Sequence, residues 1–245
     1  MMKIIVNGAM GHMGRIVCEK LAAREEFEIA ARVDKGATEE GVYAALTDYS
    51  GEADCVIDFS NHAATEELLA YCTKRSLPVV LATTGHTEEE KQLIAEASKK
   101  TAVFYAANMS VGIAVLADLA KRAAARFPDA DIEIIEWHHN RKLDAPSGTA
   151  LMLAEAIRQE RGEAVLHTGR SGYGKRDPKE IGLHAVRAGN ETGMHEILIS
   201  NGNETLTLTH KAESSALFAD GALTAALFLN KKAPGLYGTG DMMKE

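Results

Sequence analysis

Cysteine is scarce in this chain, and its scarcity limits the chemistry that the sequence can support. The three cysteines, Cys18, Cys55 and Cys72, are scattered and lack the spacing of a metal site. Free thiols of this kind are typical of a reducing compartment, so we expect a cytoplasmic protein. Long apolar runs are also missing, and we therefore expect no signal peptide and no association with a membrane.

Positive charge is in short supply as well. Lysine and arginine total 27 against 35 acidic residues, which gives a formal net charge of −8. General nucleic-acid binding requires a basic surface, so we expect no nucleic-acid partner. With 46% hydrophobic residues in 245, the chain can bury one large core or two modest ones.

The first part of the chain contains short strands that are apolar throughout, a pattern typical of a parallel sheet covered by helices on both faces. Helical segments at about 12–24, 62–75 and 87–100 alternate with these strands. The alternation predicts an α/β, Rossmann-like, doubly wound parallel sheet. The expected strands are Lys3–Asn7, Phe27–Val33, Ala53–Asp58, Pro78–Thr83 and Ala102–Ala106.

The second part alternates apolar and polar residues with period two, which indicates strands with one packed face and one solvated face. Strands are expected at 131–138, 182–187 and on both sides of a turn at Asn201-Gly202-Asn203. This pattern predicts a central α+β domain with an open mixed sheet, and the segment 162–179 is expected to be a mobile loop. We expect a discontinuous dinucleotide-binding domain at 1–108 and 217–245, and a substrate-binding and oligomerisation domain at 109–216.

A glycine-rich turn follows the first strand directly and opens the first helix. Gly8, Gly11 and Gly14 would let the backbone approach a pyrophosphate at the helix N-terminus. Asp34 follows the second strand twenty residues after Gly14, the distance expected for a carboxylate that binds the adenosine ribose. Because Lys35 lies beside Asp34, either NADH or NADPH is expected as cofactor. The alternative is a glycine-rich turn in a flavodoxin-like sheet without nucleotide.

Residues 136–150 concentrate groups that can bind anions and carry protons. His138, His139 and Lys142 precede Ser147, which is expected to cap the N-terminus of a helix. The N–H groups of Gly148 and Thr149 would then remain available to a carboxylate. If the preceding strand keeps its period, His138 shares a face with Ile132, Ile134 and Glu136.

The order of these residues resembles the signature of the 4-hydroxy-tetrahydrodipicolinate reductase (dihydrodipicolinate reductase) family of lysine and diaminopimelate biosynthesis. The signature spans His138-His139, Lys142 and Asp144–Thr149. The resemblance extends over nearly the whole chain. It includes the early glycine turn and the segments Ala82–Gly85, Ala107–Gly112, Glu180–His184, Thr209–Ala212 and Pro234–Tyr237.

The resemblance implies that NADH or NADPH reduces a small cyclic dicarboxylate to tetrahydrodipicolinate, in a homotetramer built on the central sheet. It implies His138 as proton donor with Lys142 as its cationic partner. It also implies that His139, Lys142, Ser147, Gly148 and Thr149 hold the substrate carboxylates. The implied cofactor site comprises Gly8, Gly11, His12, Met13, Gly14, Asp34, Lys35, Ala82, Thr83, Thr84, Gly85, Ala107, Asn108 and Met109. His12 and Ala82 stand where the family usually has Arg and Gly.

Two other functions fit parts of the pattern. One is another two-domain NAD(P) oxidoreductase, such as an aldehyde or amino-acid dehydrogenase. The other is a non-catalytic NAD(H)-binding sensor. A metal half-site at His138-His139 is disfavoured because no Cys or acidic ligand lies at metal spacing. His184, His195 and His210 are expected to be packed or solvent-facing strand residues without a catalytic role.

Overall fold

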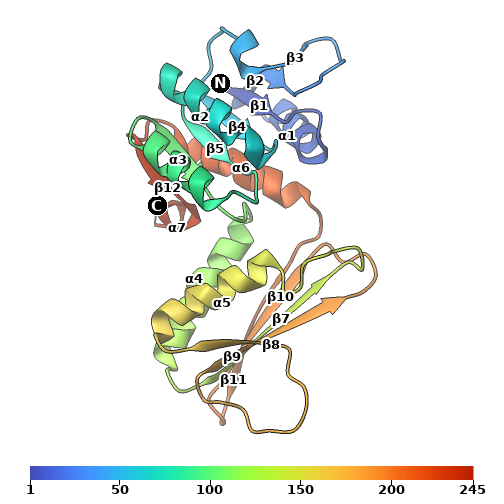
Figure 1. The fold of residues 1–245 in the computed structure, drawn as a ribbon, viewed down its shortest axis with the longest axis vertical. Coiled ribbons are helices and arrows are strands. Elements are labelled where there is room, and N and C mark those ends of the chain that lie inside the picture. The colour runs from blue at the N-terminus through green and yellow to red at the C-terminus, as the bar shows by residue number, and fades with distance from the viewer. Residues whose placement is uncertain (245) are drawn as a thin grey trace. The chain divides into compact units, whose positions relative to one another are not determined.

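The computed structural model describes residues 1–244, and the contacts within it divide the chain into two compact units. Unit 1 combines Met1–Ser110 with the chain from Ala216 onward, and unit 2 comprises Val111–Ser215. Each unit has a sheet of its own (Figure 1). Within the described residues, no helix has both the length and the apolar character needed to cross a membrane.

Unit 1 is built on a seven-stranded parallel sheet with the strand order β12-β6-β5-β4-β1-β2-β3. Its strands are β1 Met2–Asn7, β2 Phe27–Val33, β3 Val42–Tyr43, β4 Cys55–Asp58, β5 Val79–Leu81, β6 Ala102–Tyr105 and β12 Gly235–Tyr237. Its α-helices are α1 His12–Ala22, α2 Thr65–Arg75, α3 Glu88–Ser98, α6 Ala216–Leu229 and α7 Thr239–Met242. Two short 3-10 helices, η1 Leu46–Asp48 and η2 His62–Ala64, lie in the connections.

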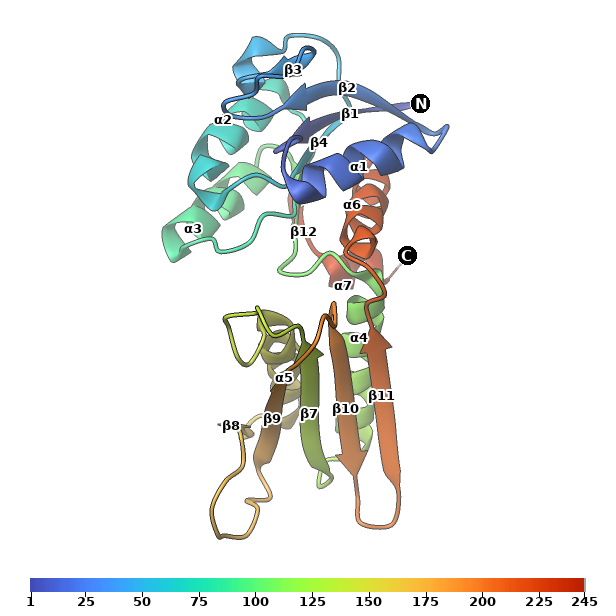
Figure 2. The same cartoon turned by 90° about the vertical axis from the view of Figure 1, so that its right-hand side faces the viewer.

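This sheet carries a hydrophobic core on each face, because successive side chains of a strand point to opposite sides. On β1, Ile4 and Val6 belong to the core that includes α1 and α6. Ile5 between them belongs to the other core, with α2 and α3. Helices therefore lie on both faces of the sheet (Figure 2), and the predicted doubly wound architecture is confirmed.

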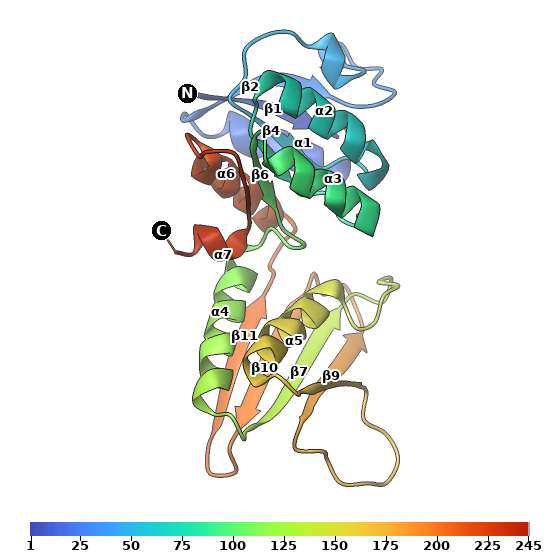
Figure 3. The ribbon, with the colours of Figure 1, turned by 60° about the vertical axis from the view of Figure 1, so that its left-hand side comes forward.

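Unit 2 contains a mixed five-stranded sheet with the order β11-β10-β7-β9-β8. Its strands are β7 Asp131–His138, β8 Val165–Thr168, β9 Glu180–Arg187, β10 Met194–Ser200 and β11 Thr205–Lys211. The helices α4 Val111–Arg126 and α5 Gly148–Arg161 lie side by side and both pack on one face of this sheet (Figure 3). The predicted open mixed sheet is confirmed.

The strand β7 shows how unit 2 orients its side chains. Ile132 and Ile134 are fully buried in the core under α4 and α5. Trp137, on the opposite face, leaves 40% of its surface exposed. Glu136 and His138 follow the same register as the two isoleucines, so this strand carries polar side chains into the packed side of the sheet.

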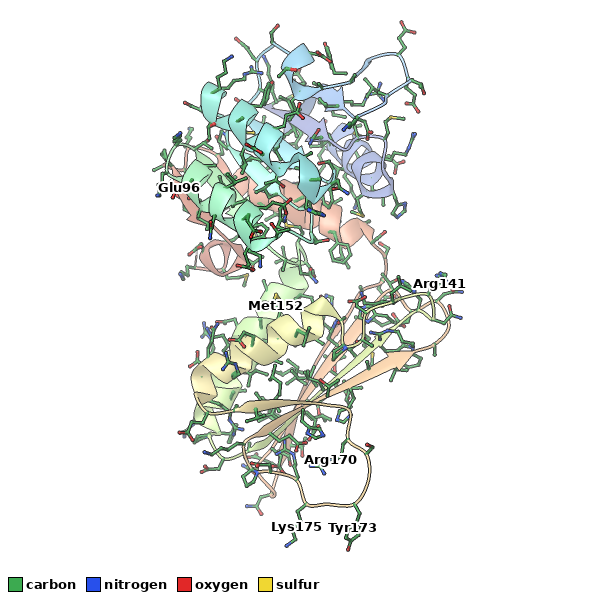
Figure 4. All side chains as sticks on the ribbon, viewed as in Figure 1. Glu96, Arg141, Met152, Arg170, Tyr173 and Lys175 are labelled. Carbon is green, nitrogen blue, oxygen red and sulfur yellow. The ribbon has the colours of Figure 1, made fainter. Side chains whose placement is uncertain are left out.

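The prediction of a loop throughout 162–179 is wrong for Val165–Thr168, which form β8 and pair in parallel with β9. This strand is short, lies at the edge of the sheet and contains two apolar residues, so its sequence shows no period that would predict a strand. Backbone hydrogen bonds with β9 hold it in the sheet. The rest of the segment is irregular, and Figure 4 shows Arg170, Tyr173 and Lys175 along it. The three-residue strand β12 was also not predicted, for the same reason.

Candidate active site

The end of β7 places a carboxylate and an imidazole in the interior of unit 2. Only 1% of Glu136 and 9% of His138 is exposed. A buried carboxylate is stable only when it is paired with a cation or with hydrogen-bond donors. The neighbouring strand β9 supplies the cation, because Arg187 lies opposite His138 in the parallel register.

Arg187 holds Glu136 through a two-pronged ion pair. Its Nη1 donates to Glu136 Oε2 at 2.7 Å and its Nη2 to Oε1 at 2.6 Å. Glu136 Oε1 also accepts the backbone N–H of Ser147 at 2.9 Å. Burial raises the pKa of Glu136, but the hydrogen bonds from Arg187 and His138 outweigh burial and lower this pKa below its usual value. Glu136 is therefore a carboxylate that connects β7, β9 and the start of α5.

His138 is held by one ring nitrogen. Its Nδ1 lies 2.5 Å from Glu136 Oε2, and because the carboxylate can only accept, Nδ1 carries a proton. The other nitrogen, Nε2, lies against Gly193, where a Cβ atom would stand 3.0 Å away. Burial lowers the pKa of His138 by more than the hydrogen bond to Glu136 raises it, and Lys142 lowers it further. Nε2 is thus the nitrogen on which a proton is gained or lost.

Ser147 connects the helix α5 to a second buried imidazole. As expected, its Oγ caps the helix by accepting the N–H of Ala150 at 3.2 Å. The same Oγ lies 3.2 Å from His195 Nε2. Burial lowers the pKa of His195 to about 4, so this ring is neutral near neutral pH. The rings of His138 and His195 meet edge to face with 5.2 Å between their centroids.

The loop from 139 to 147 carries the remaining groups expected to bind anions. Lys142 Nζ is paired with Asp144 Oδ1 at 2.8 Å. The bond from Lys142 lowers the pKa of Asp144, and a backbone bond from Gly148 lowers it further, so Asp144 is an anion at the start of α5. His139 donates its N–H to Glu191 O, while its buried Nδ1 has no hydrogen-bond partner within residues 1–244. Figure 4 shows Arg141 on the same loop.

The structure therefore brings the residues predicted to bind substrate into one region of unit 2, where some are buried and others are exposed. His138 and Ser147 belong to the buried network, whereas Lys142, Gly148 and Thr149 are partly or fully exposed. The hydrogen-bond and ring partners of His138 are Glu136 and His195, and the ion-pair partner of Lys142 is Asp144.

Three residues of this network were missed as functional residues by sequence reasoning: Glu136, Arg187 and His195. For two of them a signal exists. Glu136 interrupts the inward-facing positions of a core strand, and such a carboxylate requires a buried cation. Arg187 ends the inward-facing positions of the neighbouring strand, after Ile181 and Leu183.

The glycine turn of unit 1 lies at the carboxyl end of β1. Gly8 has a φ of +79° and, like Gly14, has no room for a side chain. A Cβ at Gly14 would lie 2.0 Å from the carbonyl oxygen of Gly8, so only glycine lets the first turn of α1 approach the strand this closely. The cradle that a pyrophosphate requires at the helix N-terminus is present here.

A cavity of about 520 Å³ opens beside this turn. Asp34 faces it from the end of β2, and its Oδ2 accepts the backbone N–H of Met10 at 2.8 Å. The carboxylate is therefore fixed relative to the glycine turn. The predicted cofactor residues that line the cavity are Gly8, Gly11, Asp34 and Lys35.

A buried aspartate ties together three strand ends on the same edge of the sheet. Asp58 accepts hydrogen bonds from Asn7 Nδ2 at 2.8 Å, Ser60 Oγ at 2.6 Å and Thr83 Oγ1 at 2.6 Å. Burial raises the pKa of Asp58, although these bonds oppose the change. Because Asn7 and Ser60 line the cavity, Asp58 fixes part of its wall.

The other predicted cofactor residues lie outside the wall of this cavity. The side chain of Met109 is in the hydrophobic core, and Asn108 Oδ1 accepts the N–H of Ser110. The exposed ones are His12, Thr84, Gly85 and Ala107, and the buried or half-buried ones are Met13, Gly14, Ala82, Thr83, Asn108 and Met109. No cluster of His, Cys, Asp or Glu that could hold a metal ion occurs among the described residues.

Two family models match the chain in succession. The model of the N-terminus of dihydrodipicolinate reductase matches residues 2–109, and the model of its C-terminus matches residues 112–243. The 4-hydroxy-tetrahydrodipicolinate reductase of Caldanaerobacter subterraneus subsp. tengcongensis is 46% identical over 256 residues, covering 100% of this chain and 99% of the relative. The Clostridium tetani protein of the same name is 42% identical, covering 99% and 97%.

Solved structures share the fold. A dipicolinate-bound dihydrodipicolinate reductase from Paenisporosarcina sp. TG-14 superposes with a TM-score of 0.83 at 24% identity, over 97% of both chains. A probable dehydrogenase from Thermotoga maritima gives a TM-score of 0.64 at 13% identity, over 99% of this chain and 93% of the other. At these identities the likeness concerns the fold alone.

Proposed function

The chain belongs to the dihydrodipicolinate reductase family, and we propose that it reduces 4-hydroxy-tetrahydrodipicolinate to tetrahydrodipicolinate with NADH or NADPH. The observation that carries the proposal is the match of both halves of the family model together with full-length relatives that bear this activity in their names. The resemblance expected from the His138-to-Thr149 motif is thereby confirmed at the level of the family.

The residues of unit 1 fit a dinucleotide. Gly8 and Gly14 form a cradle that any Cβ would fill, and the N-terminus of α1 favours the negative charge of a pyrophosphate. Asp34 would bind the adenosine ribose through its carboxylate. When bound, the reduced nicotinamide supplies the hydride. Lys35, on the cavity wall beside Asp34, would tolerate a 2′-phosphate, which supports the use of NADPH as well as NADH.

The residues of unit 2 fit a dicarboxylate. Lys142 supplies a cation, and the first residues of α5 supply backbone N–H groups. The buried Nδ1 of His139 has no hydrogen-bond partner among residues 1–244 and would accept a hydrogen bond from the substrate or donate one to it. The carboxylate of Asp144 pairs with Lys142 and accepts a backbone hydrogen bond from Gly148, so a substrate carboxylate would compete with Asp144 for these donors. Ser147 holds the start of the helix in place as its cap.

We assign the role of proton donor to His138. Hydride addition leaves negative charge on the conjugated substrate, and a positioned acid that neutralises it contributes about 10²–10⁴ in rate. The imidazolium form of His138 would release the proton from Nε2, while Nδ1 keeps its proton on Glu136. Burial lowers the pKa of His138. The two carboxylates of a bound substrate would oppose this effect and favour the charged imidazolium.

A homotetramer assembled through the open face of the five-stranded sheet is the oligomer that we propose. This face carries Trp137 and Val186, which pair across β7 and β9 and leave 40% and 39% of their surfaces exposed. Large apolar side chains on a solvent-facing sheet are typical of surfaces buried in an assembly. Light scattering of the eluting protein should give the mass of four chains, and Trp137→Glu should reduce that mass.

The cytoplasm is the compartment that we propose. Cys18, Cys55 and Cys72 are all free thiols, and burial raises the pKa of each, to beyond the usual range for Cys55. Unpaired, unreactive cysteines are typical of proteins in a reducing environment.

The function is tested by following the absorbance of reduced nicotinamide with freshly generated 4-hydroxy-tetrahydrodipicolinate. We expect sustained oxidation that depends on substrate and is inhibited competitively by pyridine-2,6-dicarboxylate. Binding of NADH without oxidation would instead indicate a sensor. Oxidation supported by amino acids or aldehydes, but not by this substrate, would indicate another two-domain oxidoreductase.

A further inference from the structure

We propose that Glu136 and Arg187 form a charge clamp, the buried carboxylate–guanidinium pair of unit 2, that sets the tautomer of His138 and the pH range in which it donates a proton. Neither residue need touch the substrate, so both are positioning residues. The inference deepens the proposed function and rests on the role of His138 as proton donor.

The clamp fixes the tautomer of His138. Glu136 Oε2 lies 2.5 Å from His138 Nδ1, and a carboxylate held ionised can only accept. Arg187 keeps it ionised, because both of its terminal nitrogens bond to the carboxylate, at 2.7 and 2.6 Å. Nδ1 is consequently fixed as the protonated nitrogen, and the second proton of the imidazolium can reside only on Nε2.

The clamp also acts on His138 through its two charges. Four titratable or charged groups face the ring of His138: Glu136 from its own strand, Arg187 from β9, His195 from β10 and Lys142 from the following loop. Glu136 favours the imidazolium, whereas Arg187 and Lys142 disfavour it. His195 stays neutral, since burial lowers its pKa to about 4. The two members of the clamp therefore act on His138 with opposite sign.

The clamp also holds the chain around the start of α5. Glu136 Oε1 accepts the backbone N–H of Ser147, the residue that caps α5. Arg187 Nη2 also donates to the carbonyl oxygen of Asp144, at 2.6 Å. The clamp thus connects the proton donor to both ends of the short segment that precedes α5. A change in the clamp should alter the position of the donor relative to the anion-binding groups.

The imidazolium of His138 carries protons on both nitrogens before transfer. Transfer breaks the Nε2–H bond, leaves that electron pair on Nε2 and forms a bond between the proton and the reduced substrate. The Nδ1–H bond to Glu136 stays intact, so the product is the neutral imidazole in the tautomer that the clamp favours. Solvent returns the proton to Nε2.

The test uses the full-length protein with labelled histidine, in which the His138 signal is assigned by its loss in His138→Gln. Glu136→Gln removes the negative charge but keeps an oxygen for Ser147, and should lower the pKa of His138 by about one pH unit. Arg187→Met removes the cation at similar length and should raise the pKa of His138, by less than Glu136→Gln lowers it. Arg187→Lys keeps the charge and should leave the pKa near the wild-type value.

Activity is measured on the same variants. The ionisation of His138 in the pH profile of kcat should move down in Glu136→Gln and up in Arg187→Met, with NADH affinity unchanged as the control. A purely structural role would lower kcat in all variants without moving the profile in opposite directions. Should Arg187→Met fail to fold, Glu136→Gln and Arg187→Lys still provide the contrast between a changed and a retained charge.

The measurements distinguish a failure of the charge clamp from a failure of the proposed donor role of His138. If the pKa of His138 is the same in wild type and Glu136→Gln, or moves in one direction in both charge-removing variants, the clamp is overturned. If the pKa moves as expected but the kcat profile does not follow, the clamp controls His138 and the proposed donor role is wrong.

Discussion

Asp144→Asn should make the protein bind dicarboxylates more tightly. Asp144 Oδ1 pairs with Lys142 Nζ at 2.8 Å, so a substrate carboxylate that binds Lys142 as proposed would have to displace Asp144. The side chain of Asp144 is 55% exposed, and an ion pair this open to solvent is worth at most about 1 kcal/mol. Asparagine has nearly the same shape but no charge. Removing the internal competitor should therefore lower the inhibition constant of pyridine-2,6-dicarboxylate by up to about fivefold.

The matched variant is Lys142→Met, which should have the opposite effect. A hydrogen bond to a charged group contributes about 1.5–3 kcal/mol, so losing it should weaken dicarboxylate binding by roughly 10–150-fold. The two variants together distinguish competition from a general disturbance of the loop, because a disturbed loop would weaken binding in both.

The assay is competitive inhibition by pyridine-2,6-dicarboxylate at low and constant ionic strength, since salt screens charges at exposed sites. The dissociation constant of NADH serves as the control, because Lys142 and Asp144 belong to unit 2 and the glycine turn to unit 1. Weaker inhibition in Asp144→Asn, or unchanged inhibition in Lys142→Met, would show that Asp144 does not compete with the dicarboxylate for Lys142.

Other consequences can be measured separately. Ser147→Ala removes the cap of α5 and should cost about 1 kcal/mol in free energy of unfolding, measured by urea denaturation. Gly14→Ala places a Cβ 2.0 Å from a carbonyl oxygen and should weaken NADH binding in calorimetry, whereas an unchanged affinity would show that the turn does not hold the pyrophosphate. The pKa of His195 is lowered from 6.5 to about 4 in the folded protein, so the unfolded chain binds more protons between these values. Stability should then fall as the pH drops through this window, by on the order of 3 kcal/mol in all, and His195→Gln should reduce the loss.

Much of the fold follows from two periodicities in the sequence. Runs such as Ile4-Ile5-Val6 are apolar at every position because both faces of their strand are covered, and the structure places Ile5 in one core and its neighbours in the other. Alternation along Ile132, Ile134 and Glu136 likewise predicts a sheet with a single packed face. These signals are local, because the spacing of apolar residues along one strand is enough to show which of its faces are buried.

The contacts that assemble the candidate site are not local. Arg187 and Glu136 are 51 positions apart, and nothing in the spacing of residues states that β9 lies beside β7 in parallel register. His195 was expected to be a packed or solvent-facing strand residue, and the structure buries it. Its contact with Ser147 Oγ depends on how α5 is placed over the sheet. The pairing of the edge strand β8 with β9 could not be predicted either, because it also joins segments that are not adjacent in the sequence.

The most direct test of the account is the rate of hydride transfer in His138→Gln, followed by stopped-flow absorbance after NADH-loaded protein is mixed with substrate. We expect a rate lower by about 10²–10⁴, with NADH affinity unchanged. A rate within about tenfold of wild type would contradict the central claim that His138 supplies the proton.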